Sequence, residues 1–300
     1  MLKIAWHPIY QHPLPERHRF PMIKYDLLPK QLLHEGTCSE ANFFEPTVPD
    51  TSHILAVHTQ DYVQRLFNLE LTAKEIRRTG FPLSKELVDR EVIIADGTIK
   101  GAEYALTHGI AFNIAGGTHH AYSNHGEAFC LLHDQAIAAR YLQQHQLAQK
   151  ILIVDLDVHQ GNGTAEIFAG DTSVFTFSMH GKSNYPFRKE QSDLDIALED
   201  NCTDEVYLNT LYKTLPQLID KEKPDFIFYL SGVDVLLEDK LGRIGMSIQG
   251  CKERDRFVLS TCKHNDIPVQ CSMGGGYSPH IKNIIEAHAN TYRLAQDIYF

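Results

Sequence analysis

Residues 151–163 read Ile-Leu-Ile-Val-Asp-Leu-Asp-Val-His-Gln-Gly-Asn-Gly, an apolar run that turns into ionisable residues. The first four residues, three of them β-branched, predict a strand buried on both faces of a sheet. Successive side chains of a strand point to opposite faces, so Asp155, Asp157 and His159 are expected on one side. The two glycines that follow indicate a turn.

Three ionisable side chains at the end of a buried strand are costly unless their charge is compensated. A divalent cation is the simplest compensation, so this stretch predicts a metal site. The alternative interpretation is a solvated strand end whose polar side chains cap the next helix.

Three other apolar runs end in the same way. Residues 111–115 lead into Gly-Gly-Thr-His-His, 225–230 into Ser-Gly-Val-Asp, and 267–271 into Ser-Met-Gly-Gly-Gly-Tyr. In open parallel α/β sheets, ligands bind outside the carboxyl ends of the strands. We therefore expect one crevice bounded by His119, His120, Asp155, Asp157, His159, Asp234 and Tyr277.

Helical patterns separate the strand-like runs. Apolar spacing predicts helices over 58–67, 97–106, 131–146, 204–221, 250–264 and 281–298. Residues 1–7 are expected to form a first strand, and 35–50 and 179–195 long loops. This alternation predicts an α/β fold with an open parallel sheet and helices on both faces.

Composition narrows the class of protein. The 300 residues are 43% hydrophobic, which suits a sizeable core, and no linker divides them, so we expect a single domain over 1–300. A net charge of −10 disfavours a nucleic-acid partner. No apolar run reaches a membrane span, and the first residues lack a signal peptide's apolar region, so a cytoplasmic location is expected.

Four motifs, taken in order, carry a resemblance. They are Gly-Gly-Thr-His-His-Ala at 116–121, Asp-Leu-Asp-Val-His-Gln-Gly-Asn-Gly at 155–163, Ser-Gly-Val-Asp at 231–234 and Gly-Gly-Gly-Tyr at 274–277. Together they resemble the zinc-dependent histone deacetylase family of the arginase/deacetylase superfamily, closest in character to class IV and bacterial histone-deacetylase-like proteins. The resemblance implies a histone-deacetylase-like catalytic domain whose central parallel sheet has about eight strands.

The same resemblance implies one Zn²⁺ per chain, bound by Asp157, His159 and Asp234. An Asp/Asp/His set would also accept Fe²⁺. Zinc would polarise the amide carbonyl and lower the pKa of its bound water. His120 would act as general base and acid, and Tyr277 would stabilise the oxyanion.

His119 and Asn162 complete the implied catalytic set. His119 would hydrogen-bond the same water, with Asp155 behind it to fix its tautomer. Many relatives carry an aspartate at the position of Asn162, where it pairs with the second histidine. An amide brings no charge, so we expect a lower pKa for His120 than an aspartate would give.

The family also carries structural K⁺. Its inner ligands would be Asp155, Asp157, His159, Ser178 and Met179, and an outer site would fall near Phe168, Asp171 and Val174. The acyl channel would be lined by Phe129, Tyr185, Phe187, Leu241 and Gly275. Arg19 would line an inner product pocket.

The implied reaction is hydrolysis of an N-acyl-lysine amide in a protein or peptide, by a deacetylase or a longer-chain deacylase. An apolar pocket separates acyl lengths weakly, so both remain open. A small N-acyl amine such as an acetylpolyamine is the alternative substrate, ranked lower because Leu241 gives an apolar rim. The sequence carries no signal for an oligomeric state.

Three other functions are weighed against this one. A dimanganese ureohydrolase of the arginase type would need further Asp and His ligands. A non-catalytic acyl-lysine-binding protein could lose a tandem histidine or Tyr277, and this chain retains them. A metal-assisted phosphohydrolase is suggested by Asp155-x-Asp157, but no phosphate-cradling Gly-Lys loop accompanies it.

Overall fold

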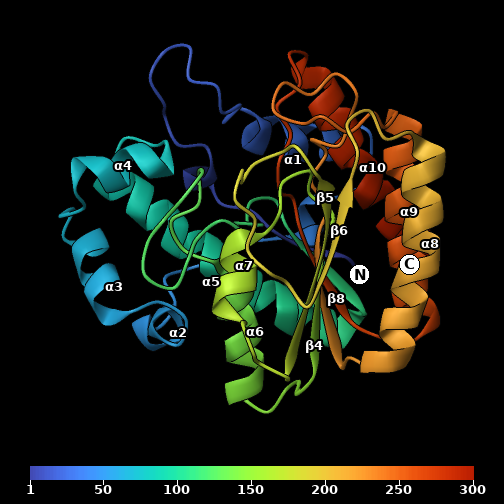
Figure 1. The fold of residues 1–300 in the computed structure, drawn as a ribbon, viewed down its shortest axis with the longest axis horizontal. Coiled ribbons are helices and arrows are strands. Elements are labelled where there is room, and N and C mark those ends of the chain that lie inside the picture. The colour runs from blue at the N-terminus through green and yellow to red at the C-terminus, as the bar shows by residue number, and fades with distance from the viewer.

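The computed structural model describes residues 1–300, and its centre is one eight-stranded sheet in which every strand pairing is parallel (Figure 1). The strand order is β2-β1-β3-β8-β7-β4-β5-β6. The strands are β1 Lys3–Ala5, β2 Phe43–Phe44, β3 Ile110–Asn113, β4 Ile151–Asp155, β5 Val174–Gly181, β6 Leu194–Leu198, β7 Phe226–Leu230 and β8 Val269–Ser272.

Ten α-helices and two short 3₁₀ helices surround the sheet. The α-helices are α1 Lys24–His34, α2 Thr51–Leu55, α3 Gln60–Phe67, α4 Ala73–Thr79, α5 Lys85–His108, α6 Asp134–Gln144, α7 Asn162–Ile167, α8 Asp204–Glu222, α9 Ile248–His264 and α10 Ile281–Tyr299. The 3₁₀ helices are η1 Pro8–Tyr10 and η2 Glu40–Asn42. None of the helices combines the length and apolar character needed to cross a membrane.

The helices cover both faces of the sheet. Figure 1 shows α5, α6 and α7 on one side and α8, α9 and α10 on the other. Seventy-nine buried hydrophobic residues form one continuous core cluster. The predicted fold class, an open parallel sheet of about eight strands between helices, is confirmed.

The central strand β4 is buried along its whole length, as its apolar sequence predicts. It pairs with β5 on one side and β7 on the other, so that Asp155 lies opposite Ser178 and Leu230. The site-bearing loops therefore leave the sheet at one edge, where the carboxyl ends of its strands meet.

The longest helix, α5, begins well before the predicted segment 97–106. The Ser84 hydroxyl accepts a hydrogen bond from the Leu87 amide at 3.1 Å, and the helix ends at Gly109, whose φ of +83° suits glycine. Arg90 and Glu91 interrupt the apolar pattern of its first half, but both are buried as an ion pair. The helix consequently packs along most of its length, which periodicity alone does not predict.

The two segments expected as long loops contain regular structure. In 179–195, β5 continues to Gly181 and β6 begins at Leu194. In 35–50, the structure has the short helix η2 and the two-residue strand β2. The expectation fails for β2 because two residues are too few for a periodic signal, and for β6 because its side chains are only partly buried.

Candidate active site and metal centre

The side chains predicted for the site lie in loops after four adjacent strands. In strand order they are His119 and His120 after β3, Tyr277 after β8, Asp234 after β7, and Asp157 and His159 after β4. All are buried except Tyr277, which is partly exposed. The structure thus brings the motif residues together in one crevice at the carboxyl edge of the sheet.

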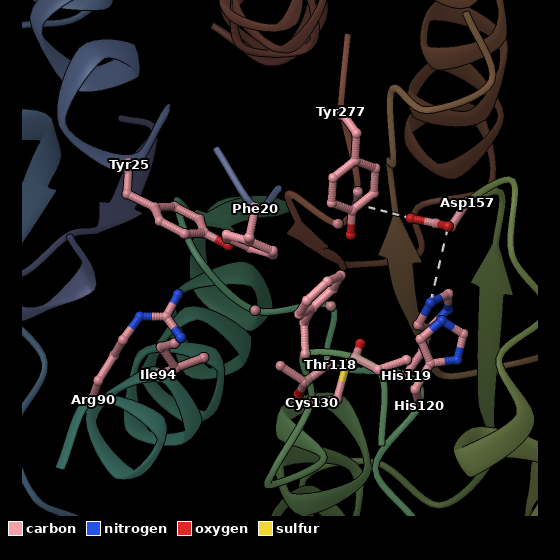
Figure 2. Close-up of a pocket in the computed structure, with 16 residues that line it drawn as sticks. Phe20, Tyr25, Arg90, Ile94, Thr118, His119, His120, Cys130, Asp157 and Tyr277 are labelled. Atoms are coloured by element: carbon pink, nitrogen blue, oxygen red, sulfur yellow. Dashed lines mark hydrogen bonds and ion pairs between the residues drawn. The ribbon is translucent and has the colours of Figure 1, made fainter. Parts of the chain in front are cut away.

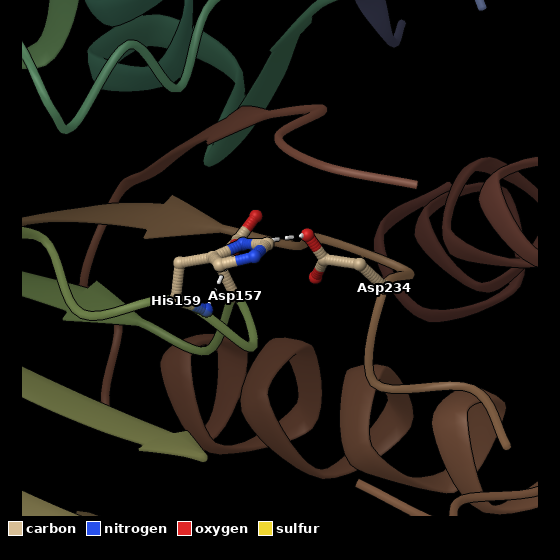
Figure 3. Close-up of side chains that lie close together, drawn as sticks. All are labelled: Asp157, His159 and Asp234. Carbon is tan, nitrogen blue, oxygen red and sulfur yellow. Dashed lines mark hydrogen bonds and ion pairs between the residues drawn. The ribbon is translucent and has the colours of Figure 1, made fainter. Parts of the chain in front are cut away.

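Asp157, His159 and Asp234 each offer a ligand atom, and these atoms lie within 4.8 Å of one another (Figure 3). Nδ1 of His159 is 3.0 Å from Oδ1 of Asp157 and 3.2 Å from Oδ2 of Asp234. Oδ2 of Asp234 is buried and has no aligned hydrogen-bond partner. Two carboxylates, an imidazole and an unsatisfied buried oxygen are the donor set of a divalent cation.

The backbone around these ligands differs from the expected strand. β4 ends at Asp155, so the expected extension of the strand through His159 was wrong, and strand alternation does not orient Asp157 and His159. Hydrogen bonds orient them instead, because the chain turns once it leaves the sheet. Oδ1 of Asp155 accepts from the Asp157 amide at 3.1 Å, and Oδ1 of Asp157 accepts from the His159 amide at 3.0 Å.

Two further backbone amides fix the ligand carboxylates. The Gly275 amide donates to Oδ2 of Asp157 at 2.8 Å, and the Val158 amide donates to Oδ1 of Asp234 at 3.0 Å. A β-carbon at Gly275 would collide with Oδ2 of Asp234, so only glycine allows this approach. The loop after β8 therefore holds the Asp157 side chain, and the loop after β4 holds the Asp234 side chain.

His119 is paired with a buried carboxylate. Its Nδ1 lies 2.7 Å from Oδ2 of Asp155, and its Nε2 lies 3.9 Å from Oδ1 of Asp157. A carboxylate only accepts hydrogen bonds, so Nδ1 carries a hydrogen. Burial alone would lower the pKa of His119, but Asp155 and Asp157 raise it above its ordinary value.

His120 is paired with a neutral amide. Its Nδ1 lies 2.5 Å from Oδ1 of Asn162. Burial lowers the pKa of His120 well below its ordinary value, and the imidazoles of His119 and His159 lower it further. The Asn162 contact itself raises this pKa slightly, so the comparison with an aspartate at this position stays a prediction.

Glu127 lies behind this pair, and the sequence analysis missed it. Its Oε1 accepts from Nδ2 of Asn162 at 3.1 Å and from the hydroxyl of Tyr185. Its Oε2 lies 3.4 Å from Nε2 of His125. One carboxylate thus holds both the partner of His120 and a predicted channel wall. A lone glutamate in a loop carries no periodic or motif signal.

Tyr277 faces the tandem histidines across the cavity, with Asp157 between them (Figure 2). Its ring lies 6.2 Å from the His159 ring. Its backbone amide donates to Oδ2 of Asp239 at 2.6 Å. Burial raises the pKa of the Tyr277 hydroxyl well above its ordinary value, so the group remains a proton-bearing donor.

An inner cavity extends from the site toward α1 and α5 (Figure 2), and its polar lining includes Arg90. Nε of Arg90 donates to the Tyr10 carbonyl at 2.9 Å, and Nη1 of Arg90 pairs with Glu91. Arg19, expected here, was placed wrongly. It is exposed at the outer opening because its guanidinium packs over the Phe129 ring, 5.0 Å from the centroid.

Lys24 is a second charged residue that the sequence analysis missed. It is fully buried, and its Nζ donates to the Gly274 carbonyl at 2.9 Å. The ammonium also lies 5.8 Å from the centre of the Tyr277 ring. Burial lowers the pKa of Lys24 to about 8. Its position on the first turn of an amphipathic helix gave no sign of burial.

Four of the five predicted channel residues line the outer opening: Phe129, Tyr185, Phe187 and Leu241. The Tyr185 ring lies 5.2 Å from the His120 ring. Phe187 is 90% exposed, so it flanks the opening and forms no closed wall. The fifth, Gly275, lines the inner cavity next to Asp157.

The residues predicted for inner K⁺ binding are adjacent, since Asp155 and Ser178 are register partners and Met179 follows on β5. Near the outer prediction, Phe168 and Val174 are buried. Asp171 there forms an ion pair of 2.6 Å with Arg140, so its carboxylate already has a cationic partner.

Comparison with known proteins identifies the family of the chain and agrees with its fold. The model of the histone deacetylase domain family matches residues 18–292. The chain therefore belongs to the histone deacetylase domain family, which supports a hydrolase of the deacetylase type.

Individual relatives agree over most of the chain. An uncharacterized protein from Picosynechococcus sp. is 46% identical over 296 residues, covering 99% of each chain. "Histone deacetylase 2" of Arabidopsis thaliana is 28% identical over 278 residues, covering 89% of this chain and 72% of that protein. A solved structure of "an HDAC homolog complexed with SAHA" superposes with a TM-score of 0.84 at 22% identity, covering 97% and 82%, and shares the fold.

Proposed function

We propose that residues 1–300 form a single catalytic domain that hydrolyses the Nε-acyl amide of lysine with a bound Zn²⁺. One observation carries the proposal. The triad Asp157, His159 and Asp234 shares a buried crevice with a tyrosine hydroxyl and two histidines, one with a raised pKa and the other with a lowered pKa. Such a set supplies a metal, a base and an oxyanion donor within one site.

The triad would hold the zinc ion, since it combines two carboxylates, an imidazole and an unsatisfied oxygen on Asp234. Zinc bound there would polarise the amide carbonyl and acidify a water molecule. Structural K⁺ would bind beside it through Asp155, Asp157, His159, Ser178 and Met179.

His120 is the proposed general base. The Asn162 oxygen accepts from Nδ1, which leaves the Nε2 lone pair free to take a proton. The low pKa of His120 keeps the ring neutral before the reaction. The proton removed from water then passes to the leaving lysine amine.

His119 and Tyr277 are proposed to stabilise the charges that develop during the reaction. His119, held by Asp155 and raised in pKa, would donate a hydrogen bond to the attacking water and stabilise developing charge. Tyr277, held by Asp239, would donate its hydroxyl to the oxyanion on the far side of the carbonyl. Phe129 and Tyr185 would pack against the methylenes of the lysine.

A peptide series from Nε-acetyl-lysine to Nε-myristoyl-lysine tests the proposal with zinc-loaded wild type and Tyr277→Phe. We expect wild-type turnover and a fall in kcat of about 10²–10³ in the variant, because one oxyanion donor is lost. KM should change little. No turnover of any member by the zinc-loaded wild type would contradict the proposal.

A further inference from the structure

We propose that the preferred substrate carries carboxylates close to the acyl-lysine, and that a basic opening selects it. The basic opening is the set Arg19, Arg78, Lys240 and Arg243. The inference rests on the proposed function and adds the charge class of its substrate.

The outer opening of the site has one sign of charge. Its lining reaches His120, His159 and Tyr277 at the bottom, and it includes the four basic residues and no Asp or Glu. The whole chain has 38 acidic and 28 basic residues, for a net charge of −10. The opening is therefore locally positive, with four basic residues and no carboxylate in its lining, although the protein as a whole is acidic.

The four cations come from three separate parts of the fold. Arg19 precedes α1, Arg78 lies near the end of α4, and Lys240 and Arg243 lie in the loop between β7 and α9. They line the same opening as the predicted channel residues Phe129 and Leu241, and Arg19 packs over the Phe129 ring. A charge on the substrate would meet several of them at once.

Most of this charge is available to a ligand. Arg19 and Lys240 are exposed and pair with no carboxylate. Arg78 lies 3.9 Å from Glu127, and Arg243 lies 3.3 Å from Asp200 with 59% of its side chain exposed. The Arg243–Asp200 pair is exposed on both sides, and such pairs are weak and exchange readily for a ligand carboxylate. Glu127 is largely buried, but 41% of the Arg78 side chain is exposed, so a second carboxylate can approach it from solvent.

The position of the cations assigns the anion to one end of the substrate. The four basic residues line the outer opening, whereas Arg90 in the inner cavity is already paired with Glu91. The anionic group therefore belongs to the part of the substrate that stays outside, beyond the lysine methylenes, and not to the acyl group. Cationic polyamines and lysine-rich peptides would be repelled there.

Two sources provide a carboxylate at that distance: Asp or Glu beside the acyl-lysine in a peptide, and the α-carboxylate of free Nε-acyl-lysine. The test compares acetyl-lysine peptides flanked by Glu, Gln or Lys, and Nε-acetyl-lysine with its α-carboxamide. We expect kcat/KM about tenfold or more higher for the Glu than the Lys peptide, mainly through KM. The difference should shrink at high salt, where charges are screened beyond a few Å.

Variants that remove one charge test whether the basic opening causes the preference for Glu peptides. Lys240→Gln and Arg19→Gln should each lower the ratio of kcat/KM for Glu over Lys peptides, and Lys240→Glu should lower it further. Lys282→Gln, which removes an exposed charge on α10, is the matched control and should leave the ratio unchanged. An equal fall in the control would overturn the inference, because the effect would then follow net charge.

Binding separates failure of this inference from failure of the proposed function. Affinities of fluorescent forms of the same peptides are measured with Tyr277→Phe. If all peptides are hydrolysed and bound alike whatever their charge, the inference is wrong and the hydrolase stands. If none is hydrolysed but affinity still ranks Glu over Lys, the hydrolase is wrong and the charge selection holds.

Discussion

The side chain of Asn162 shows how one amide can fix the proton position on a catalytic imidazole. Its Nδ2 donates to Glu127 at 3.1 Å, an acceptor-only group when ionised, so its oxygen must face Nδ1 of His120. Nδ1 then has to carry a hydrogen, and Nε2 keeps its lone pair. The Glu127 carboxylate therefore acts on His120 through the amide of Asn162.

Asn162→Asp should move the pH dependence of activity. In the wild type, burial and two neighbouring imidazoles hold the pKa of His120 well below its ordinary value, so the base stays neutral into the acidic range. A carboxylate beside Nδ1 stabilises the protonated ring and raises that pKa. The acidic limb of kcat/KM against pH should therefore move to higher pH, and an unchanged profile would refute this assignment.

Glu127→Ala should lower kcat by about 10–100-fold, the usual effect of losing a partner that orients an active-site group. The Asn162 amide would lose its acceptor and could turn its nitrogen toward His120. Glu127→Gln keeps an oxygen acceptor and should recover most of the rate. Steady-state kinetics of both variants provide the measurement.

Tyr185→Phe is the control for the second contact of Glu127, since it removes only the hydroxyl that reaches this carboxylate. We expect it to affect KM more than kcat, because Tyr185 lines the channel. A kcat as low as that of Glu127→Ala would assign the effect of Glu127 to the channel wall and not to Asn162.

At the scale of elements, helix α9 holds two loops of the site together through one buried arginine. Nη1 of the fully buried Arg254 donates to the carbonyls of Leu156 at 3.2 Å and Gly232 at 2.7 Å. Its charge is balanced by the buried Asp255, 2.7 Å away. One guanidinium thus joins the loop that bears Asp157 to the loop after β7.

Arg254→Met should lower the free energy of unfolding by about 3–5 kcal/mol, because Asp255 is left buried without a counter-ion. Zinc affinity of the folded fraction should also fall, since the two loops lose their common donor. Urea denaturation and competition with a chelator measure the two effects.

Arg256→Met is the matched control on the same helix. This side chain is 45% exposed and pairs only with Glu253, so we expect at most about 1 kcal/mol. Equal destabilisation by both substitutions would show that helix composition, not the buried contacts, explains the result.

For the whole molecule, the sequence predicted what depends on local pattern. The sequence pattern is strong for buried strands such as β4 and for the motif residues that follow them. An apolar run that leads directly into ionisable residues is rare. No such sequence signal marks Glu127, Lys24 or Arg254. Each is a single charged residue whose partners lie far away in sequence. The fold and the motif side chains were therefore predictable, as were the contacts of His119 with Asp155 and of His120 with Asn162, which the family resemblance implied. The contacts made by Glu127, Lys24 and Arg254 required the structure.

Metal binding should join the two ligand-bearing loops, after β4 and β7, and thereby increase the free energy of unfolding of the whole chain. A ligand that binds only the folded state stabilises it by RT ln(1 + [L]/Kd), about 2.7 kcal/mol at a hundredfold excess over Kd. For a chain of this size, the thermal midpoint Tm should rise by several degrees on adding Zn²⁺ and fall with a chelator. Protons compete with metal for carboxylates and imidazoles, so the rise should be larger at pH 8 than at pH 5.

Asp234→Asn provides the decisive comparison in calorimetry. It removes the charge of the ligand whose Oδ2 has no aligned hydrogen-bond donor, while Oδ1 can still accept from the Val158 amide. The variant should fold without metal, and Zn²⁺ should raise its Tm far less than that of the wild type. An equal rise in both proteins would mean that zinc binds elsewhere, and the triad would lose its role as the metal site.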